Sequence, residues 1–239
     1  MIRVDCPALA GHQERYHDLA GVPLRVIAEL VPGTRVVNYD PINLDNLLAR
    51  AVVDEATGGR GLETLDDGWY WLPVPLRQLW ESADGLPLYA ATVFRPDGGQ
   101  TEDRDYWHKR AQPGGWTRGA LNPRNGRWME RRVPMPTLVA ERLVAEAIGD
   151  PDEVARLLAP LSHISKRRGS GFGAVARWRV EPADFDLVRN GLLTRPLPVE
   201  AWELLGSLPT AAPAPIGWTM PQWRPALFRP GWWSETPAA

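Results

Sequence analysis

Cysteine and histidine are scarce in this sequence, and each shortage excludes a kind of site. Cys6 is the only cysteine in 239 residues, which excludes an intramolecular disulfide framework and a zinc site built from cysteines alone. The four histidines, at positions 12, 17, 108 and 163, follow neither HExxH nor HxH spacing. We therefore expect no structural metal and no cofactor.

Long hydrophobic runs are also missing. No stretch approaches the roughly 18 to 20 consecutive apolar residues of a membrane span, and the opening MIRVDCPALAGHQERYHD lacks the apolar centre of a secretory signal. We expect a cytoplasmic protein without a membrane partner. Its 239 residues, 44% of them hydrophobic, suffice for the core of one or two domains.

Charge is balanced over the whole chain but unevenly distributed along it. The chain has 27 Lys plus Arg and 29 Asp plus Glu, yet residues 104–132 hold eight bases against two acids. Residues 163–179 hold five bases and no acid. These stretches, called here the first and second basic segments, are typical of a localised polyanion site, although two solvated surfaces would give the same counts.

Arginine supplies 25 of the 27 basic residues, and tryptophan occurs 12 times. Guanidinium groups suit bidentate phosphate contacts and stack on aromatic rings. A GC-rich coding sequence would raise the arginine content equally well. Most tryptophan side chains pack in protein cores. Only tryptophans inside a basic segment are therefore candidates for base stacking.

Hydrophobic periodicity predicts a strand at 24–31 and a helix after Asn43. Leu24, Val26, Ala28 and Leu30 alternate as in a half-buried strand. Asn43 can cap this helix, and Gly58 ends it. Capping of the helix start also explains Asp45 better than a metal site does. The apolar stripe of the helix comprises Leu44, Leu47, Leu48, Ala51 and Val52.

The middle of the chain is less regular. Residues 69–76 and 86–94 are aromatic and β-branched enough for strands, with prolines that confine them to edges or ends. In residues 95–137, apolar residues do not recur at the spacing of a helix or a strand. This stretch is therefore predicted to be a long functional loop or a mobile insertion. Residues 138–148 fit a helix or a strand.

A second helix is predicted from Asp150 as N-cap, with Pro151 in its first turn and Glu153 completing a capping box. His163 follows as a polar cap at the helix end. Beyond a glycine-rich turn at 166–173, residues 174–181 alternate again. We expect Ala176, Trp178 and Val180 on the core face and Val175, Arg177, Arg179 and Glu181 on the opposite, mostly basic face.

This order of elements predicts an α+β protein with a ferredoxin-like domain, in which an antiparallel sheet carries two helices on one face. RNA-recognition modules bind RNA on the free face of such a sheet. We expect an N-terminal extension at 1–22, in which His12, Tyr16 and His17 are exposed. The domain follows at 23–194, with its basic insertion at about 95–137 and a Pro- and Trp-rich tail at 195–239 that packs on it.

The turn KRRGSGFG is the strongest single binding motif. Its glycines would let backbone amides approach a polyanion, while Lys166, Arg167 and Arg168 supply charge. It matches neither a phosphate-binding P-loop nor GxGxxG. A tight turn with solvated arginines explains the same residues.

The segment from the second helix through LSHISKRRGSGFGAVARWRVE resembles the last helix, glycine-rich loop and strand of the RAMP proteins of CRISPR systems. More narrowly, it is similar to the Cas-five-like subunit of type IV effector complexes. Four further stretches follow in the family's order, and the resemblance spans about residues 24–233. They are DPINLDNLLARAV at 40–52, LPLYAATVF at 86–94, DYWHKR at 105–110, and RPLP at 195–198 with GWTMPQW at 217–223. Ser165 and Phe172 depart from the Gly and Tyr common in the family.

The resemblance implies a noncatalytic subunit that holds the five-prime handle of a CRISPR RNA and caps a backbone of other subunits. A large subunit and target DNA would be further partners in the assembled complex. In DYWHKR, Trp107 or Tyr106 would stack on a base while Lys109 and Arg110 contact phosphate. The full set of candidate RNA-binding residues is Trp107, His108, Lys109, Arg110, Lys166, Arg167, Arg168, Gly169, Ser170, Gly171, Phe172, Gly173, Arg177 and Arg179.

Two alternatives come from other functional classes. His108 as general base, with Lys109 as electrostatic partner, would make a metal-independent repeat endoribonuclease. The sequence shows no second acid or base held against His108. A protein-assembly adaptor without RNA affinity of its own is the other alternative.

Overall fold

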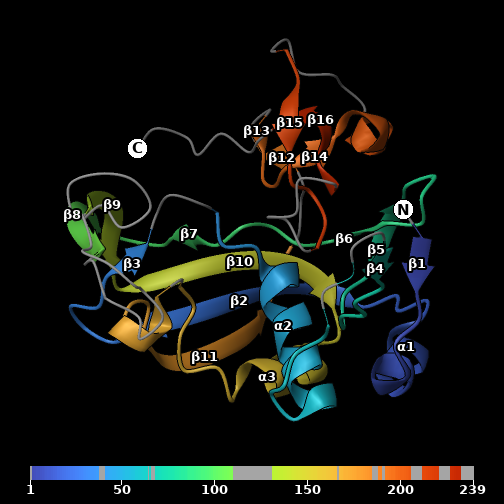
Figure 1. Cartoon of the computed structure of the whole chain (residues 1–239), viewed down its shortest axis with the longest axis horizontal. Coiled ribbons are helices and arrows are strands. Elements are labelled where there is room, and N and C mark those ends of the chain that lie inside the picture. The colour runs from blue at the N-terminus through green and yellow to red at the C-terminus, as the bar shows by residue number, and fades with distance from the viewer. Residues whose placement is uncertain are drawn as a thin grey trace, which may run out of the picture.

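The computed structural model of the chain is drawn in Figure 1. It describes residues 2–37, 41–63, 65, 68–109, 131–165, 167–184, 188–189, 192–205, 212–220 and 227–232. The protein is mixed α+β with mostly antiparallel sheets, and the described residues form three α-helices. These are α1 at Ala10–Tyr16, α2 at Leu44–Thr57 and α3 at Pro151–Leu158. No helix within these ranges has the length and apolar character needed to cross a membrane.

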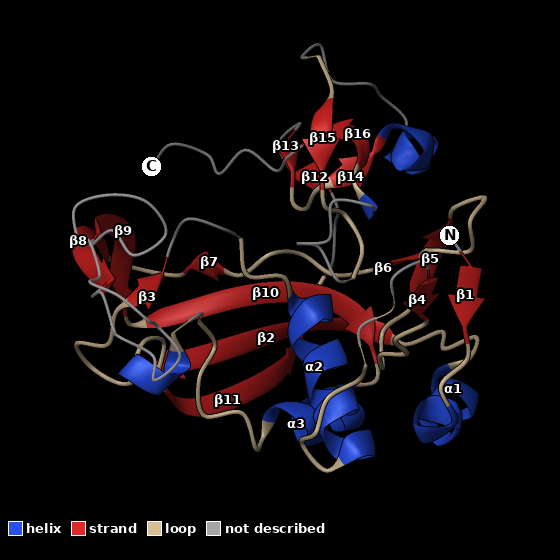
Figure 2. Ribbon diagram, viewed as in Figure 1, coloured by secondary structure: helices blue, strands red, loops and turns tan. Residues whose placement is uncertain are grey.

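The largest sheet has four strands in the order β11-β2-β10-β7, and all neighbours are antiparallel. Their bounds are β2 Val22–Leu30, β7 Arg95–Pro96, β10 Arg142–Gly149 and β11 Val175–Pro182. Helices α2 and α3 lie across one face of this sheet (Figure 2). Residues 138–148, which fit either a helix or a strand by sequence, form the end of β9 and most of β10.

The predicted alternation in β2 is confirmed, since Leu24, Val26, Ala28 and Leu30 are all buried. They belong to one core with the apolar sides of α2 and α3. The predicted alternation in β11 is only partly right. The register of β11 against β2 shifts between Val175 and Arg177, so Val175 packs on the core and Ala176 is exposed. Because a β-bulge adds one residue to the strand, the side chains before it point to the opposite face of the sheet from the one that simple alternation predicts.

The predicted caps of the helices are partly confirmed. The Asp150 carboxylate accepts hydrogen bonds from the backbone N–H groups of Asp152 at 3.0 Å and Glu153 at 3.1 Å. The capping box is wrong, because the Glu153 carboxylate binds Tyr16 and Arg156 instead. At α2, Asn43 makes no side-chain capping bond. Asp45 is buried and pairs with Arg195.

Residues 95–137 were predicted to be a loop, and this is wrong for both of its ends. Strands β8, Gln100–Lys109, and β9, Arg131–Ala140, form a hairpin that pairs from Gln100↔Ala140 to Lys109↔Arg131. Strand β3, Val36–Val37, adds a third strand beside β9. Residues 110–130 lie outside the described residues. The hairpin shows no apolar period because its outer half is exposed on both faces.

The N-terminal residues are part of the folded body. Strand β1, Ile2–Val4, pairs in parallel with β4, Gly68–Tyr70, and a 3-10 turn at Pro7–Leu9 leads into α1. Leu9 is fully buried. The expected exposure of His12 and Tyr16 is wrong, since both are buried, whereas His17 is exposed. Their burial follows from the packing of α1 beside α2 and α3.

The C-terminal residues form a second small sheet, in the order β14-β16-β15, with a 3-10 helix at Val199–Leu205. Its strands are β14 Leu197–Pro198, β15 Ala214–Ile216 and β16 Arg229–Trp232, and a short pair precedes it at β12 Val188–Arg189 and β13 Leu192–Leu193. A second core joins Trp202 and Trp218 of this region to Trp69 and Leu88. It lies beside the hairpin of β5, Gln78–Glu81, and β6, Pro87–Tyr89.

Candidate nucleic-acid interface

The β8–β9 hairpin presents two neighbouring aromatic residues on its opposite faces. Tyr106 and Trp107 are adjacent in β8, so their side chains point to different sides of the strand. Tyr106 is 37% exposed and Trp107 is 38% exposed. On the Tyr106 side, the guanidinium of Arg132 lies 3.8 Å from the ring centroid. Each face of the hairpin thus carries an aromatic ring within reach of solvent.

The Trp107 side of the hairpin is tied to the body through Arg35. Its guanidinium contacts Asp103 at 2.9 Å and Asp105 at 3.5 Å, both on the same face of β8 as Trp107. The backbone carbonyl of Arg35 accepts a hydrogen bond from the N–H of Gly173 at 2.7 Å. One residue therefore connects the hairpin to the glycine-rich turn.

The glycine-rich turn is built from left-handed backbone positions and held by two hydroxyl groups. Arg167, Gly171 and Gly173 have φ values of 66°, 80° and 66°. The Thr34 hydroxyl donates to the carbonyl of Gly171 at 3.3 Å, and the Ser165 hydroxyl accepts from the N–H of Val37 at 2.9 Å. The turn is thereby fixed to the loop and strand that follow β2.

The three glycines of the turn have different roles. A Cβ at Gly173 would lie 2.5 Å from the Cβ of Ser165, so this position has no room for a side chain. A Cβ at Gly169 or Gly171 would meet nothing within 4 Å. Gly173 therefore closes the turn structurally, while the backbone at 169–171 faces open space and is accessible to a ligand.

The two basic segments meet where the turn reaches the hairpin. The guanidinium of Arg167 lies 4.9 Å from the centroid of the Trp107 ring, a cation–π distance. Arg167 and Arg168 are exposed, and neither forms an ion pair within the described part of the chain. The result is an exposed indole beside two uncompensated guanidinium groups, which can offer a stacking surface and phosphate donors together.

The predicted site residues fall into three groups. The hairpin and turn bring together Trp107, Arg167, Arg168, Gly169, Ser170, Gly171, Phe172 and Gly173. Lys166 and Arg110 lie outside the described residues, as does the side chain of Lys109, whose backbone belongs to β8. The remaining residues lie away from this surface: Arg177 and Arg179 on β11 of the large sheet, and His108 on the Tyr106 face of β8.

The outer face of that sheet carries its charges in pairs across the strands. Arg179 contacts Glu29 at 3.1 Å and also bonds Glu181, and Arg25 contacts the buried Glu146 at 3.1 Å. The prediction of a mostly basic face on β11 is therefore wrong for Arg179. The prediction that Trp178 lies on the core face is confirmed, because it packs on the helix side of the sheet, with the core.

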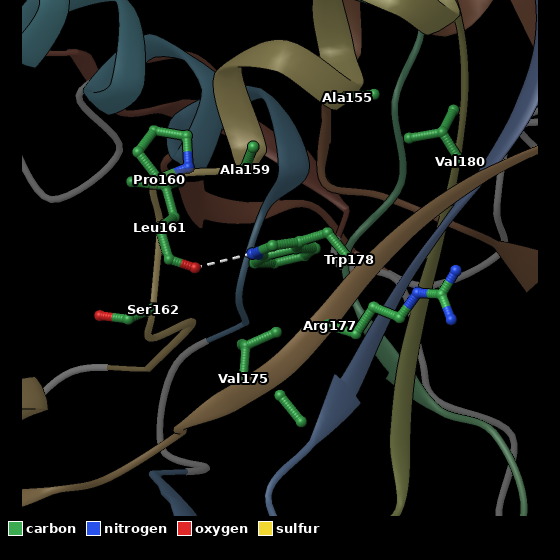
Figure 3. Close-up of a pocket in the computed structure, with 10 residues that line it drawn as sticks. Ala155, Ala159, Pro160, Leu161, Ser162, Val175, Arg177, Trp178 and Val180 are labelled. Carbon is green, nitrogen blue, oxygen red and sulfur yellow. Dashed lines mark hydrogen bonds between the residues drawn. The ribbon is translucent and has the colours of Figure 1, made fainter.

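Arg177 has a different environment from Arg179. It lines a hollow of about 380 Å³ between the end of α3 and β11. The Trp178 indole N–H in this hollow donates to the carbonyl of Leu161 at 2.7 Å, and the Arg177 side chain extends away from that contact (Figure 3). Arg177 forms no ion pair within the described ranges.

Sequence reasoning missed Thr34 and Arg35, which hold the interface together. Both follow β2 in a stretch with an excess of acids, and no motif marks them. The only available signal was their position in a short loop between two apolar segments. His108 is exposed and opposite Arg132 on β9. Among the described residues, no group of three or more His, Cys, Asp or Glu side chains could hold a metal.

Comparison with known proteins adds no assignment, because no protein-family model and no curated protein matches this sequence.

Proposed function

We propose that this protein is a noncatalytic CRISPR RNA-binding subunit, similar to the Cas-five-like RAMP subunit of type IV effector complexes. It holds the five-prime handle of the CRISPR RNA and caps the backbone of the complex, in RNA-guided defence or plasmid targeting. The observation that carries this proposal is the contact of Arg167 with Trp107. It joins two basic segments that are far apart in the sequence into one surface.

We further propose that the large sheet with α2 and α3 is a ferredoxin-like domain. The elements follow the chain order β2, α2, β7, β10, α3, β11. Their spatial order β11-β2-β10-β7, with antiparallel neighbours, is that of the split βαβ pattern. This agreement supports the resemblance to RAMP proteins, which rests on the sequence stretches described above.

The ligand best suited to the interface is single-stranded RNA. Splayed bases stack on exposed aromatic rings such as Trp107, and backbone phosphates bind guanidinium groups such as those of Arg167 and Arg168. We place the RNA at the hairpin and the glycine-rich turn rather than on the outer face of the sheet. There, the ion pairs of Arg25 and Arg179 would have to be broken before phosphate could bind.

In the assembled complex, the partners would be a backbone subunit, a large subunit and target DNA. Base pairing by the guide would read the target sequence, while this subunit fixes the end of the RNA, by analogy with other RNA-guided effectors. His108 makes the endoribonuclease the competing function. It lies in β8 next to Trp107, but its side chain is on the Tyr106 face of the strand, so RNA bound against Trp107 would have to cross the edge of the hairpin to reach its imidazole.

Affinity for repeat RNA measured against salt tests the proposal. If about five phosphates are contacted, the log–log slope should be near −3.5, from roughly −0.7 per phosphate of a single strand. The double variant Arg167→Gln, Arg168→Gln loses two phosphate contacts, so its slope should be shallower by about 1.4. The control Arg50→Gln, Arg60→Gln removes the same charge from the exposed side and end of α2 and should leave the slope unchanged.

Two results would contradict the proposal. A flat salt titration of the full chain would favour an adaptor without RNA affinity. Saturable cleavage of repeat RNA in the presence of chelator, lost in His108→Ala, would instead identify an endoribonuclease.

A further inference from the structure

A larger cavity lies far from the candidate interface. It has a volume of about 590 Å³, within the size range of small-molecule sites. Its walls come from the N-terminal segment and from the β5–β6 hairpin, and they include Arg3, Trp71, Arg77, Gln78, Trp80 and Tyr89. In Figure 1, β1 and β5 lie at one end of the long axis and β8 and β9 lie at the other.

The aromatic walls of this cavity are held in place before any ligand binds. The Trp71 indole N–H donates to the Tyr89 hydroxyl at 3.2 Å, and that hydroxyl donates to the carbonyl of Leu72 at 3.3 Å. Burial raises the pKa of Tyr89, which keeps its phenol neutral. The Trp80 ring packs on Trp218 with centroids 5.5 Å apart. Rings fixed in this way lose little conformational entropy when a planar group binds.

Two arginines, Arg3 and Arg77, also line the cavity. The guanidinium of Arg3 lies 4.6 Å from the Trp71 ring centroid, and its ion pair is with the exposed Asp5 at 3.5 Å. Arg77 is exposed and has no ion pair within the described residues. A guanidinium stacked on an aromatic face keeps its N–H edges available for an anion. The cavity therefore combines flat aromatic surface with cations suited to phosphate.

We propose that this cavity binds a nucleotide, with the base against Trp71 and Trp80 and the phosphate at Arg3 and Arg77. The other polar residues that line the cavity offer both hydrogen-bond donors and acceptors. They therefore favour a nucleotide, whose base has both kinds of group, over inorganic phosphate alone. Gln78, which donates to Glu81 at 3.0 Å, and Asp18 are among these residues. The site shares no residue with the hairpin and the glycine-rich turn, so it does not rest on the proposed RNA-handle function. A free nucleotide and a nucleotide within a strand present the same chemistry.

Calorimetry of the full chain with adenosine 5′-monophosphate, adenosine, ribose 5-phosphate and the trinucleotide ApApA tests this site. The monophosphate should bind saturably, and adenosine and ribose 5-phosphate should each bind about tenfold more weakly, since each lacks one recognised group. Arg77→Gln and Arg3→Gln should each lower affinity for the monophosphate about tenfold. In the Arg167→Gln, Arg168→Gln variant, which removes two guanidinium groups of the candidate interface, tighter binding of ApApA than of the monophosphate would assign the cavity to a strand. Equal binding would assign it to a free nucleotide.

Matched variants keep the result independent of the candidate interface. Arg60→Gln, and the double variant Arg167→Gln, Arg168→Gln, should bind the monophosphate as the unmodified chain does, with thermal melts as folding control. Absence of saturation by both the monophosphate and ApApA would overturn the proposal. So would unchanged affinity in both Arg3→Gln and Arg77→Gln, or saturable binding of the peptide Glu-Trp-Glu without binding of the monophosphate.

Discussion

Arg195 Nη2 lies 3.2 Å from Asp45 Oδ2, and the two side chains are 1% and 3% exposed. The same guanidinium donates to backbone carbonyls of Tyr89, Ala91 at 3.1 Å and Trp218 at 2.9 Å. A buried charge is tolerated only when it is paired and its donors are satisfied. This one residue thus links the start of α2, the end of β6 with the residues after it, and the C-terminal region at Trp218.

Removing either partner of this pair should strongly destabilise the protein. We expect Arg195→Met to leave the Asp45 carboxylate uncompensated and to lower the free energy of unfolding by about 3 to 5 kcal/mol. The double variant Asp45→Asn, Arg195→Met should recover part of that loss. Chemical denaturation of the unmodified chain, Asp45→Asn, Arg195→Met and the double variant measures the coupling. Equal stability of Arg195→Met and the unmodified chain would mean that the C-terminal sheet is held without this contact.

The Arg195 contacts join several of the stretches on which the proposed resemblance rests. RPLP supplies Arg195, LPLYAATVF supplies the carbonyls of Tyr89 and Ala91, and GWTMPQW supplies that of Trp218. Periodicity predicted β2, α2 and α3 because those elements bury one regular face. It could not predict this cluster, which joins residues more than a hundred positions apart. The partners of Asp45 and Glu153 were misjudged for the same reason, because local capping rules consider only neighbours in the chain.

The glycine-rich turn shows the same limit at the candidate site. Its sequence indicated a tight, positively charged turn, and three of its residues do adopt positive φ. Which glycine is structural depends on Ser165, and what anchors the turn depends on Thr34, neither of which a motif reveals. The loop prediction for 95–137 failed at β8 and β9 because the outer half of this hairpin is exposed on both faces and needs no hydrophobic alternation.

Substitutions at Gly173 and Gly171 should therefore separate folding from binding. Gly173→Ala places a Cβ within 2.5 Å of Ser165 at positive φ and should cost roughly 3 kcal/mol of stability. Gly171→Ala should cost only about 1 kcal/mol, because its Cβ enters open space. Gly171→Val should weaken RNA binding while the fold is retained, because its side chain stands before the exposed backbone. Thermal melts and RNA affinity are measured for each variant. Equal losses of stability in Gly173→Ala and Gly171→Ala would contradict the conclusion that Gly173 alone is required for the fold of the turn.

The two aromatic residues of β8 should contribute unequally to RNA affinity. Trp107 faces Arg167 and the turn, so Trp107→Leu should weaken repeat RNA binding by about 1 to 3 kcal/mol, the usual value of one stacked base. Tyr106→Leu removes a ring of similar exposure from the opposite face and should have little effect. Fluorescence anisotropy with labelled RNA measures both variants. A larger loss in Tyr106→Leu would place the RNA on the other side of the hairpin.

Stability should fall in acid because of Glu153, which holds α1 to α3. Its carboxylate accepts hydrogen bonds from Arg156 at 3.0 Å, Tyr16 at 2.5 Å and Arg15 at 3.3 Å. The Arg156 hydrogen bond is the largest cause that lowers the pKa of Glu153 to about 2 from an ordinary value of 4.5. A lowered carboxylate pKa stabilises the fold above the unfolded-state value, and this stabilisation is lost as pH falls from about 4.5 to about 2. The size of the loss is roughly 3 kcal/mol.

The Tyr16 side of the same contact gives the opposite pH dependence. Burial, together with the hydrogen bond to Glu153, raises the pKa of Tyr16 to about 12 from 10.0. The neutral phenol is therefore favoured in the folded state. Its contribution to the stability of the fold is complete below pH 10 and is lost as pH rises towards about 12.

Denaturation of the unmodified chain, Glu153→Gln and Tyr16→Phe across both pH ranges separates the two groups. Glu153→Gln should flatten the acid limb and Tyr16→Phe the alkaline limb, because each removes the group that titrates there. If both limbs persisted in both variants, the pH dependence would come from other residues, and α1 would be held chiefly by the burial of Leu9.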